Sequence, residues 1–230
     1  MTRPLILLFD IDGTLLHAHG AGRRAISRAF ERLLGAPGAI DTVDLQGMTD
    51  PLILKAGLAA IGASHREDLL DALLETYLAS LEHELLSDSS VTVLEGVTEM
   101  LSALPTMGLP IAVGLGTGNV EAGARAKLGR CGLSSHFDFG GYGSDHELRS
   151  ELLRIGAQRG AARLGRPVEQ CRTLVIGDTR RDIDAARAIG AECLAVGTGG
   201  VALDALLAHG ATCAVKTLSD PRAYAFLVAH

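Results

Sequence analysis

Short apolar runs alternate along the chain with segments whose apolar residues have helical spacing. The runs, which predict buried strands, are Leu5–Phe9, Pro110–Leu115, Thr173–Ile176, Cys193–Val196 and Thr212–Val215. The helical segments between most of them are Glu95–Leu104, Val120–Gly129, Glu147–Leu164, Arg181–Ile189 and Ala202–His209. Strands that alternate with helices favour a parallel sheet with helices on both faces. The pattern therefore predicts an α/β fold built on a Rossmann-like parallel sheet.

Residues 16–90 interrupt this alternation. They contain three helical segments, Gly22–Leu34, Pro51–Ile61 and His65–Leu86, and we expect no further strand between the first one and about residue 110. Leucines from Leu70 to Leu85 recur at helical spacing and predict a stripe that faces the core. We expect residues 16–90 to form an inserted helical domain, with linkers near 16–21 and 87–93. Residues 1–15 and 91–230 then form the α/β core domain.

Acidic residues follow the first predicted strand directly, in the sequence Asp10-Ile11-Asp12-Gly13-Thr14. Two carboxylates at the end of a buried strand are costly to place near a core without a ligand. Oxygen ligands of this kind suit a hard divalent cation such as Mg²⁺, and an aspartate is also a possible nucleophile towards phosphate. An ordinary acidic turn is the other interpretation at this point.

Two other strand ends also carry polar residues. Gly116-Thr117-Gly118-Asn119 offers a hydroxyl and backbone N–H groups at a helix start, which suits an anion, and it lacks the dinucleotide-binding glycine spacing. Asp178 and Asp182 flank another strand–helix junction, where one acid can bind a metal while the other orients it. A plain strand–helix turn explains the first segment equally well, and helix capping explains Asp182.

Composition narrows the classes of function. The chain has 230 residues, 47% of them hydrophobic but only 3% aromatic, so Ala, Leu, Ile and Val must fill the core, as in helices packed on a parallel sheet. A net charge of −6 argues against a nucleic-acid partner. No apolar stretch approaches the ~20 residues that span a bilayer, so we expect no membrane partner. Four cysteines without C-x-x-C spacing and the lack of a signal peptide predict a cytoplasmic protein.

The three polar strand ends, in this order, resemble the haloacid dehalogenase superfamily. Asp10 to Thr14 match its first motif, Thr117 its second, and the segment from Gly177 to Asp182 its fourth. The resemblance covers nearly the whole chain, and residues 16–90 are similar to the family's helical cap in its earliest position. The phosphoglycolate-phosphatase-like branch is the most similar.

The resemblance implies a role for each matched residue. Asp10 would be the nucleophile that forms an aspartyl-phosphate. Asp12 would be general acid and then general base, with its backbone carbonyl on the metal. Thr117 would hydrogen-bond the phosphoryl group, with Gly118 and Asn119 beside it.

A Mg²⁺ site and a cation complete the implied arrangement. Asp178 would ligate the metal with Asp10 and Asp12, and Asp182 would support this shell. The family's third motif is usually a lysine, but residues 130–178 contain none. Arg149 is the best substitute because arginine binds phosphate through two parallel hydrogen bonds, and Arg154 is second. A surface ion pair is the other explanation for either arginine.

These residues together predict a Mg²⁺-dependent phosphatase that hydrolyses a small phosphorylated metabolite. Asp12 favours phosphoryl transfer over dehalogenation, because a halide leaving group needs no proton. A phosphosugar mutase of the same fold and a non-catalytic phosphate-binding protein are the alternatives. Substrate choice would lie in the cap, where Arg23 or Arg24 suits a carboxylate or phosphate, unless they form only an exposed basic helix start. The sequence leaves the oligomeric state open.

Overall fold

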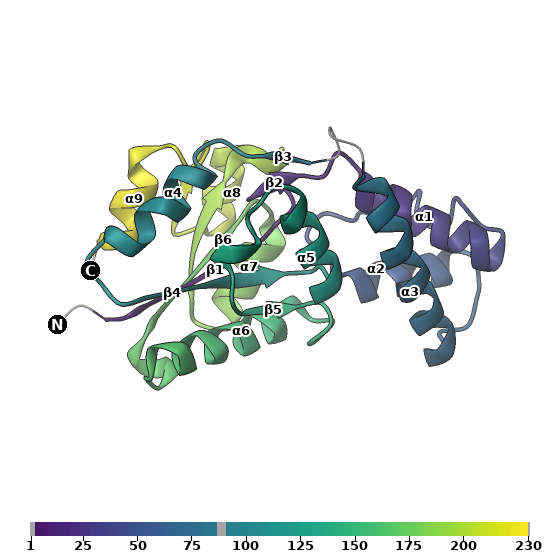
Figure 1. The fold of residues 1–230 in the computed structure, drawn as a ribbon, viewed down its shortest axis with the longest axis horizontal. Coiled ribbons are helices and arrows are strands. Elements are labelled where there is room, and N and C mark those ends of the chain that lie inside the picture. The colour runs from purple at the N-terminus through teal and green to yellow at the C-terminus, as the bar shows by residue number, and fades with distance from the viewer. Residues whose placement is uncertain (1–2, 87–90, 230) are drawn as a thin grey trace.

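A six-stranded parallel sheet forms the centre of the molecule, as the computed structural model shows for residues 3–86 and 91–229 (Figure 1). Its strand order is β5-β4-β1-β6-β7-β8. The strands are β1 (Leu5–Phe9), β4 (Ile111–Thr117), β5 (Gly140–Tyr142), β6 (Arg172–Gly177), β7 (Glu192–Val196) and β8 (Cys213–Val215). All five predicted apolar runs are strands of this sheet, so the predicted α/β fold is confirmed.

Helices cover both faces of the sheet. The alternating side chains of β1 divide between two cores, with Leu5, Leu7 and Phe9 in one and Ile6 and Leu8 in the other. The first core includes buried residues of α4 (Val97–Ala103), α5 (Glu121–Arg130) and α9 (Pro221–Val228). The second includes residues of α6 (Arg149–Leu164), α7 (Arg180–Ala188) and α8 (Leu203–His209). A central strand buried on both faces explains why its sequence is apolar throughout.

Strand β5 and helix α9 of the core were not predicted. Strand β5 has only three residues, two of them glycines, so it shows no apolar run. Helix α9 has clear start signals that the periodicity analysis did not use. Asp220 caps it by accepting a hydrogen bond from the Arg222 backbone N–H, and Pro221 opens it.

Helices α1 (Ala21–Leu34), α2 (Asp50–Ala60) and α3 (Glu67–Glu84) form the helical insertion, which lies to one side of the sheet (Figure 1). The expected core-facing stripe of α3 is present, with Leu73, Tyr77 and Leu81 buried. The insertion is entered by β2 (Leu16–His17) and left by β3 (Thr92–Val93), which pair in antiparallel fashion. The expectation of no strand before about residue 110 was therefore wrong, because two-residue strands carry no periodic pattern. Part of the second predicted linker, residues 87–90, lies outside the described residues.

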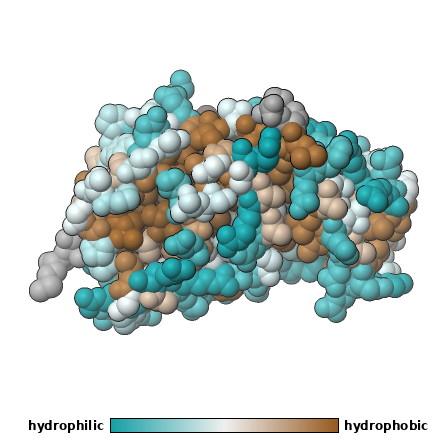
Figure 2. All heavy atoms as spheres, in the orientation of Figure 1, coloured by the Kyte–Doolittle hydropathy of each residue, from teal (hydrophilic) through white to brown (hydrophobic). Residues whose placement is uncertain are grey.

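The core helices are amphipathic. In α6, Leu152, Leu153, Ala157 and Ala161 are buried, while Arg154 is exposed. Hydrophilic residues accordingly follow the lower margin of the molecule, where α6 lies (Figure 2). Within the described part of the chain, none of the helices has the length and apolar character needed to cross a membrane.

Candidate active site

The register of the sheet brings the predicted polar residues to one edge. Phe9 of β1 is opposite Leu115 of β4 on one side and Ile176 of β6 on the other. Because all three strands are parallel, Asp10 leaves the sheet at the same level as the ends of β4 and β6. Its backbone N–H donates to the Ile176 carbonyl at 2.9 Å. The three strand ends therefore meet, as ligand sites in open α/β sheets do.

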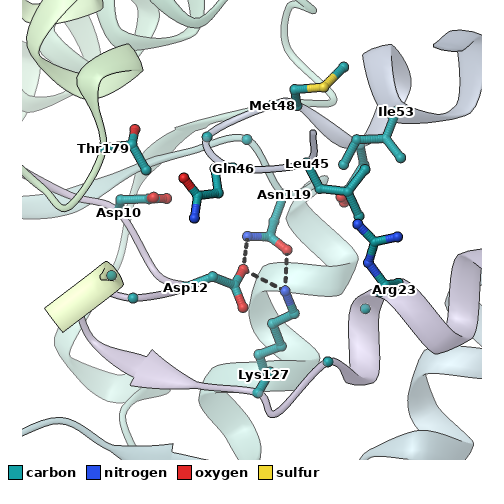
Figure 3. Close-up of a pocket in the computed structure, with 18 of the residues that line it drawn as sticks. Asp10, Asp12, Arg23, Leu45, Gln46, Met48, Ile53, Asn119, Lys127 and Thr179 are labelled. Atoms are coloured by element: carbon teal, nitrogen blue, oxygen red, sulfur yellow. Dashed lines mark hydrogen bonds and ion pairs between the residues drawn. The ribbon is translucent and has the colours of Figure 1, made fainter. Parts of the chain in front are cut away.

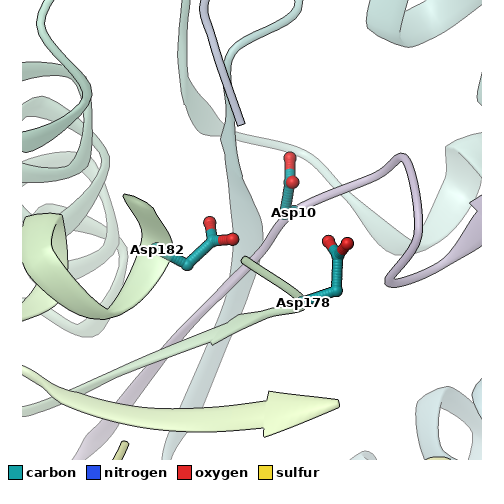
Figure 4. A group of neighbouring side chains, drawn as sticks. All are labelled: Asp10, Asp178 and Asp182. Atoms are coloured by element: carbon teal, nitrogen blue, oxygen red, sulfur yellow. The ribbon is translucent and has the colours of Figure 1, made fainter. Parts of the chain in front are cut away.

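Three buried carboxylates converge at this edge. Asp10, Asp178 and Asp182 each place an oxygen within 4.8 Å of the others, and all three are buried (Figure 4). Asp182 also stabilises the start of α7, because its carboxylate accepts hydrogen bonds from the Thr179 N–H at 3.0 Å and the Thr179 hydroxyl at 2.6 Å. The sequence left two interpretations of Asp182, as a helix-capping residue or as a member of an acidic cluster. The structure shows that Asp182 is both.

Asp178 is held in place by the first motif. The Thr14 hydroxyl donates to its Oδ1 at 3.1 Å. Gly13 has a φ of +82°, and a Cβ there would lie 2.4 Å from Asp178 Oδ2. Glycine is therefore required after Asp12 both for its backbone conformation and for the close approach of Asp178.

Arg149 is the cation of this cluster. Its Nη2 lies 3.0 Å from Asp10 Oδ2 and 2.6 Å from Asp182 Oδ1, and its side chain is buried. Its Nη1 donates to the Gly47 carbonyl of the insertion at 3.2 Å. Arg154, the second choice, pairs instead with Glu151 on the exposed face of α6. The surface ion pair considered for both arginines therefore describes Arg154 alone.

The cluster carries more negative than positive charge. Burial raises the pKa of Asp10 to about 6, against the opposing effect of Arg149, and the neighbouring acids raise it further. Burial and the charges of Asp182 and Asp10 raise the pKa of Asp178 to about 8. Three carboxylates share one guanidinium, and all the converging ligand atoms are oxygens. This set of ligands fits a hard divalent cation such as Mg²⁺, which would relieve the repulsion.

The Asp12 carboxylate faces away from the acidic cluster and towards Lys127. Lys127 Nζ lies 2.6 Å from Asp12 Oδ2 and 2.7 Å from Asn119 Oδ1, and Asn119 Nδ2 donates to Asp12 Oδ2 at 2.9 Å (Figure 3). Burial would raise the pKa of Asp12, but the charge and hydrogen bond of Lys127, with the Asn119 hydrogen bond, lower it. Asp12 is therefore held as an anion. Its side chain lies outside the three-carboxylate group, which leaves its backbone carbonyl as the possible metal ligand.

Sequence reasoning missed Lys127. The family lysine was expected among residues 130–178, and Lys127 lies just before this range, in α5. Its side chain is only 5% exposed. The available signal was its place on the helix, since Gly123, Ala124 and Leu128 share its buried face. A lysine on a face of small and apolar residues needs a buried anionic partner.

The turn after β4 contacts both the acids and the insertion. Thr117 is fully buried, and its hydroxyl accepts a hydrogen bond from Asn119 Nδ2 at 2.9 Å. The Gly118 carbonyl accepts a hydrogen bond from the Asp50 N–H at 2.8 Å. A Cβ on Gly118 would lie 2.3 Å from the Met48 carbonyl oxygen, so glycine permits the loop before α2 to approach.

Asp50 is a second residue that the sequence analysis missed. Its Oδ2 accepts hydrogen bonds from the Val120 N–H at 2.9 Å and the Tyr77 hydroxyl at 3.4 Å. Burial raises its pKa to about 6, although Lys127 opposes the rise. Asp50 thus joins the first turn of α2 to the start of α5, across the boundary between insertion and core.

A cavity of about 410 Å³ lies between these two parts of the molecule. The wall on the core side is polar and includes Asp10, Asp12, Asn119, Lys127 and Arg149. The wall on the insertion side includes the apolar residues Ile26, Leu45, Met48 and Ile53. His17, His19 and Arg23 also line it, whereas Arg24 pairs with Glu84 at 2.5 Å. Of the two arginines proposed for substrate selection, Arg23 is the one that lines the cavity.

A family model of haloacid dehalogenase-like hydrolases matches residues 5–190, which include all the acids described above. The chain belongs to this family. The α/β sheet, the helical insertion after the first motif and the polar strand ends are therefore features of a haloacid dehalogenase-like hydrolase. Arg149 remains our candidate for the cation that the family usually supplies as a lysine.

Curated relatives of this haloacid dehalogenase-like chain carry different names. The tyrosine-protein kinase PtkA of Mycobacterium tuberculosis is 27% identical over 199 residues, which are 85% of this chain and 63% of that protein. The chain thus spans less than two thirds of the length of that relative. "Probable phosphatase IndB" of Dickeya dadantii is 28% identical over 95% of this chain and 91% of its own length. A phosphoglycolate phosphatase of Pseudomonas fluorescens is 27% identical over 85% of this chain and 70% of its own length.

Solved structures share the fold over its full length. A hydrolase from Pseudomonas syringae matches with a TM-score of 0.71 at 22% identity, covering 99% of each chain. At this identity the likeness concerns the fold alone.

Proposed function

We propose that the protein is a Mg²⁺-dependent phosphatase that hydrolyses a small phosphorylated metabolite through an aspartyl-phosphate on Asp10. The observation that carries this proposal is the contact between Asp10 and Arg149 within the buried acidic cluster, beside a second acid, Asp12. A nucleophilic carboxylate, a fixed cation and a proton-transfer group then border one cavity. The relatives named as phosphatases support the same reaction.

Asp10 would attack the phosphorus atom of the bound ester. A carboxylate and a phosphate repel each other, so positive groups must face the transferring oxygens. The buried guanidinium of Arg149 lies beside Asp10 and supplies one. The Thr117 hydroxyl, at the end of β4, would donate a hydrogen bond that fixes the phosphate for attack from the Asp10 side, with Gly118 and Asn119 near it.

Asp12 would move protons in both halves of the reaction. Held as an anion by Lys127 and Asn119, it is ready to act as a base that takes a proton from the attacking water. In the first half it must give a proton to the leaving oxygen. To do so, Asp12 must first take up a proton, and its ion pair with Lys127 opposes this protonation. Lys127 would therefore set how readily Asp12 changes from base to acid.

Asp10, Asp178 and the Asp12 carbonyl would hold Mg²⁺, with Asp182 positioned by Thr179 to support them. When bound, the ion supplies charge neutralisation for the phosphoryl group. The four free cysteines fit a reducing compartment, and we place the protein in the cytoplasm.

A phosphate-release screen over metabolite phosphates, with Mg²⁺ and with a chelator, tests the proposal. We expect release only with the metal, and trapping of the phospho-enzyme state by BeF₃⁻ in the wild type but not in Asp10→Asn. Phosphate release that is equally fast with chelator would contradict it. Product analysis separates a mutase, which would isomerise a phosphosugar without releasing phosphate. Phosphate binding without turnover would indicate a non-catalytic protein.

A further inference from the structure

The three strongly basic side chains that line the cavity differ in their partners. Arg149 pairs with Asp10 and Asp182, and Lys127 pairs with Asp12. Arg23 has no ion pair among residues 3–86 and 91–229. Its Nη1 donates to the Ile40 carbonyl at 3.1 Å and its Nη2 to the Val43 carbonyl at 3.3 Å. These neutral acceptors fix the direction of the guanidinium and leave its charge uncompensated.

Arg23 is exposed, and apolar side chains lie on the side where it borders the cavity. Ile26 follows it by three residues on α1, and Leu45 and Ile53 lie beside it, with Asp12 on the opposite side (Figure 3). An anion that meets a guanidinium next to apolar groups is less exposed to water than at an open surface, so the attraction is stronger. The arginine can bind such an anion through two parallel hydrogen bonds.

We infer that Arg23 selects substrates whose alcohol part carries a second anionic group, separated from the phosphoester by an aliphatic segment. This inference rests on the proposed phosphatase function. The ester phosphate lies at Asp10, the aliphatic segment packs on Ile26, Leu45 and Ile53, and the second anion meets Arg23. A carboxylate and a second phosphate are both suitable anions.

The neighbouring residue provides a matched control. Arg24 has the same side chain one position later on α1, but its guanidinium pairs with Glu84 and donates to the His19 carbonyl. It does not line the cavity. Arg24→Gln therefore removes the same charge from the same helix without removing the proposed anion contact.

The kinetic test uses three matched phosphate monoesters: an ω-hydroxy acid ester, its neutral amide, and the corresponding diol bisphosphate. In Arg23→Gln we expect kcat/KM for the acid ester to fall about 10- to 100-fold, through KM. The preference for acid over amide should disappear with it. Arg24→Gln should keep the preference. The bisphosphate arm shows whether the second anion is a carboxylate or a phosphate. An equal loss on acid and amide would overturn the inference, because Arg23 would then only support the cavity wall.

A binding measurement separates this inference from the proposed function. ω-Phosphonocarboxylic acids and their amides resemble the esters but have no bond that a phosphatase cleaves. Calorimetric titration of the wild type should show tighter binding of the acid, by about 10-fold or more, and Arg23→Gln should remove the difference. If no ester is hydrolysed but this difference is found, the phosphatase proposal fails and the anion site stands. Equal binding of acid and amide by the wild type would overturn the anion site, whether or not esters are hydrolysed.

Discussion

The core side and the insertion side of the cavity, here called the core wall and the insertion wall, differ in how their charged groups are paired. On the core wall, charged groups are paired with groups of opposite charge, as Arg149 is with Asp10 and Asp182. On the insertion wall, apolar and polar side chains alternate, and the charge of Arg23 meets only backbone carbonyls. The core residues come from strand ends whose register fixes them, whereas the insertion residues come from helices and a loop. On our proposals, the core wall performs the chemistry and the insertion wall chooses the substrate.

We expect the largest effect from Asp10→Asn on the core wall. This substitution removes the proposed nucleophile with little change in the shape of the side chain. We expect kcat to fall at least about 1,000-fold, because removal of a nucleophile abolishes the covalent route. Phosphate release and circular dichroism together measure activity and folding. The control is Asp71→Asn, an exposed acid on α3, which should keep its activity. A folded Asp10→Asn protein with near-normal turnover would refute the assignment.

Arg149→Ala should have the next largest effect, on the same wall. Loss of the buried guanidinium leaves the phosphate facing the acids without its cation, and we expect kcat to fall about 100- to 1,000-fold. Arg154→Ala, on the exposed face of the same helix, should change it less than about twofold. An equal fall of kcat in both variants would show that the contact of Arg149 with Asp10 does not contribute to catalysis.

Lys127→Met tests whether the ion pair with Asp12 matters for proton transfer. A partner that orients a reacting group typically contributes about 10- to 100-fold, so we expect a loss of that size in kcat. Lys127→Arg should recover part of it, and the exposed Lys216→Met should be neutral. Turnover measured with good and poor leaving groups locates the effect. Loss confined to folding stability, with unchanged kcat, would make Lys127 a structural residue.

Asp50→Asn should have the smallest effect on activity and a measurable effect on stability. Its pKa of about 6 in the folded protein exceeds the usual 3.8, so folding favours the protonated form. The contribution of Asp50 to the free energy of unfolding is then lost as pH rises from about 4 to above 6, by up to about 3 kcal/mol. Denaturant unfolding should show Asp50→Asn gaining stability relative to the wild type over this range. A difference that stays constant with pH would contradict the raised pKa.

The core wall was more predictable than the insertion wall. Asp10 and Asp178 follow strongly apolar strands, and parallel strands bring their carboxyl ends to one edge, so the sequence pattern predicted both strand ends. The family resemblance joined them in one site, and the pairing of β1 with β6 brings them together. Arg149 was found only through the family resemblance. Lys127 and Asp50 were missed because their partners depend on tertiary packing: Lys127 lies within α5, and Asp50 at the start of α2 contacts α3 and the start of α5. Strands β2 and β5 were missed because they are too short to produce periodicity.

The hydrogen bond from Arg149 to Gly47 joins the phosphate-facing cation to the loop that precedes α2. Any displacement of that loop from the core takes one hydrogen bond from the guanidinium, while the insertion also loses the Asp50 contacts to Gly118 and Val120. Under the proposed function, opening of the insertion for substrate entry or product departure would thus leave the guanidinium with fewer contacts beside Asp10. Hydrolysis of a phosphorylated Asp10 would then be fastest while the insertion covers the cavity.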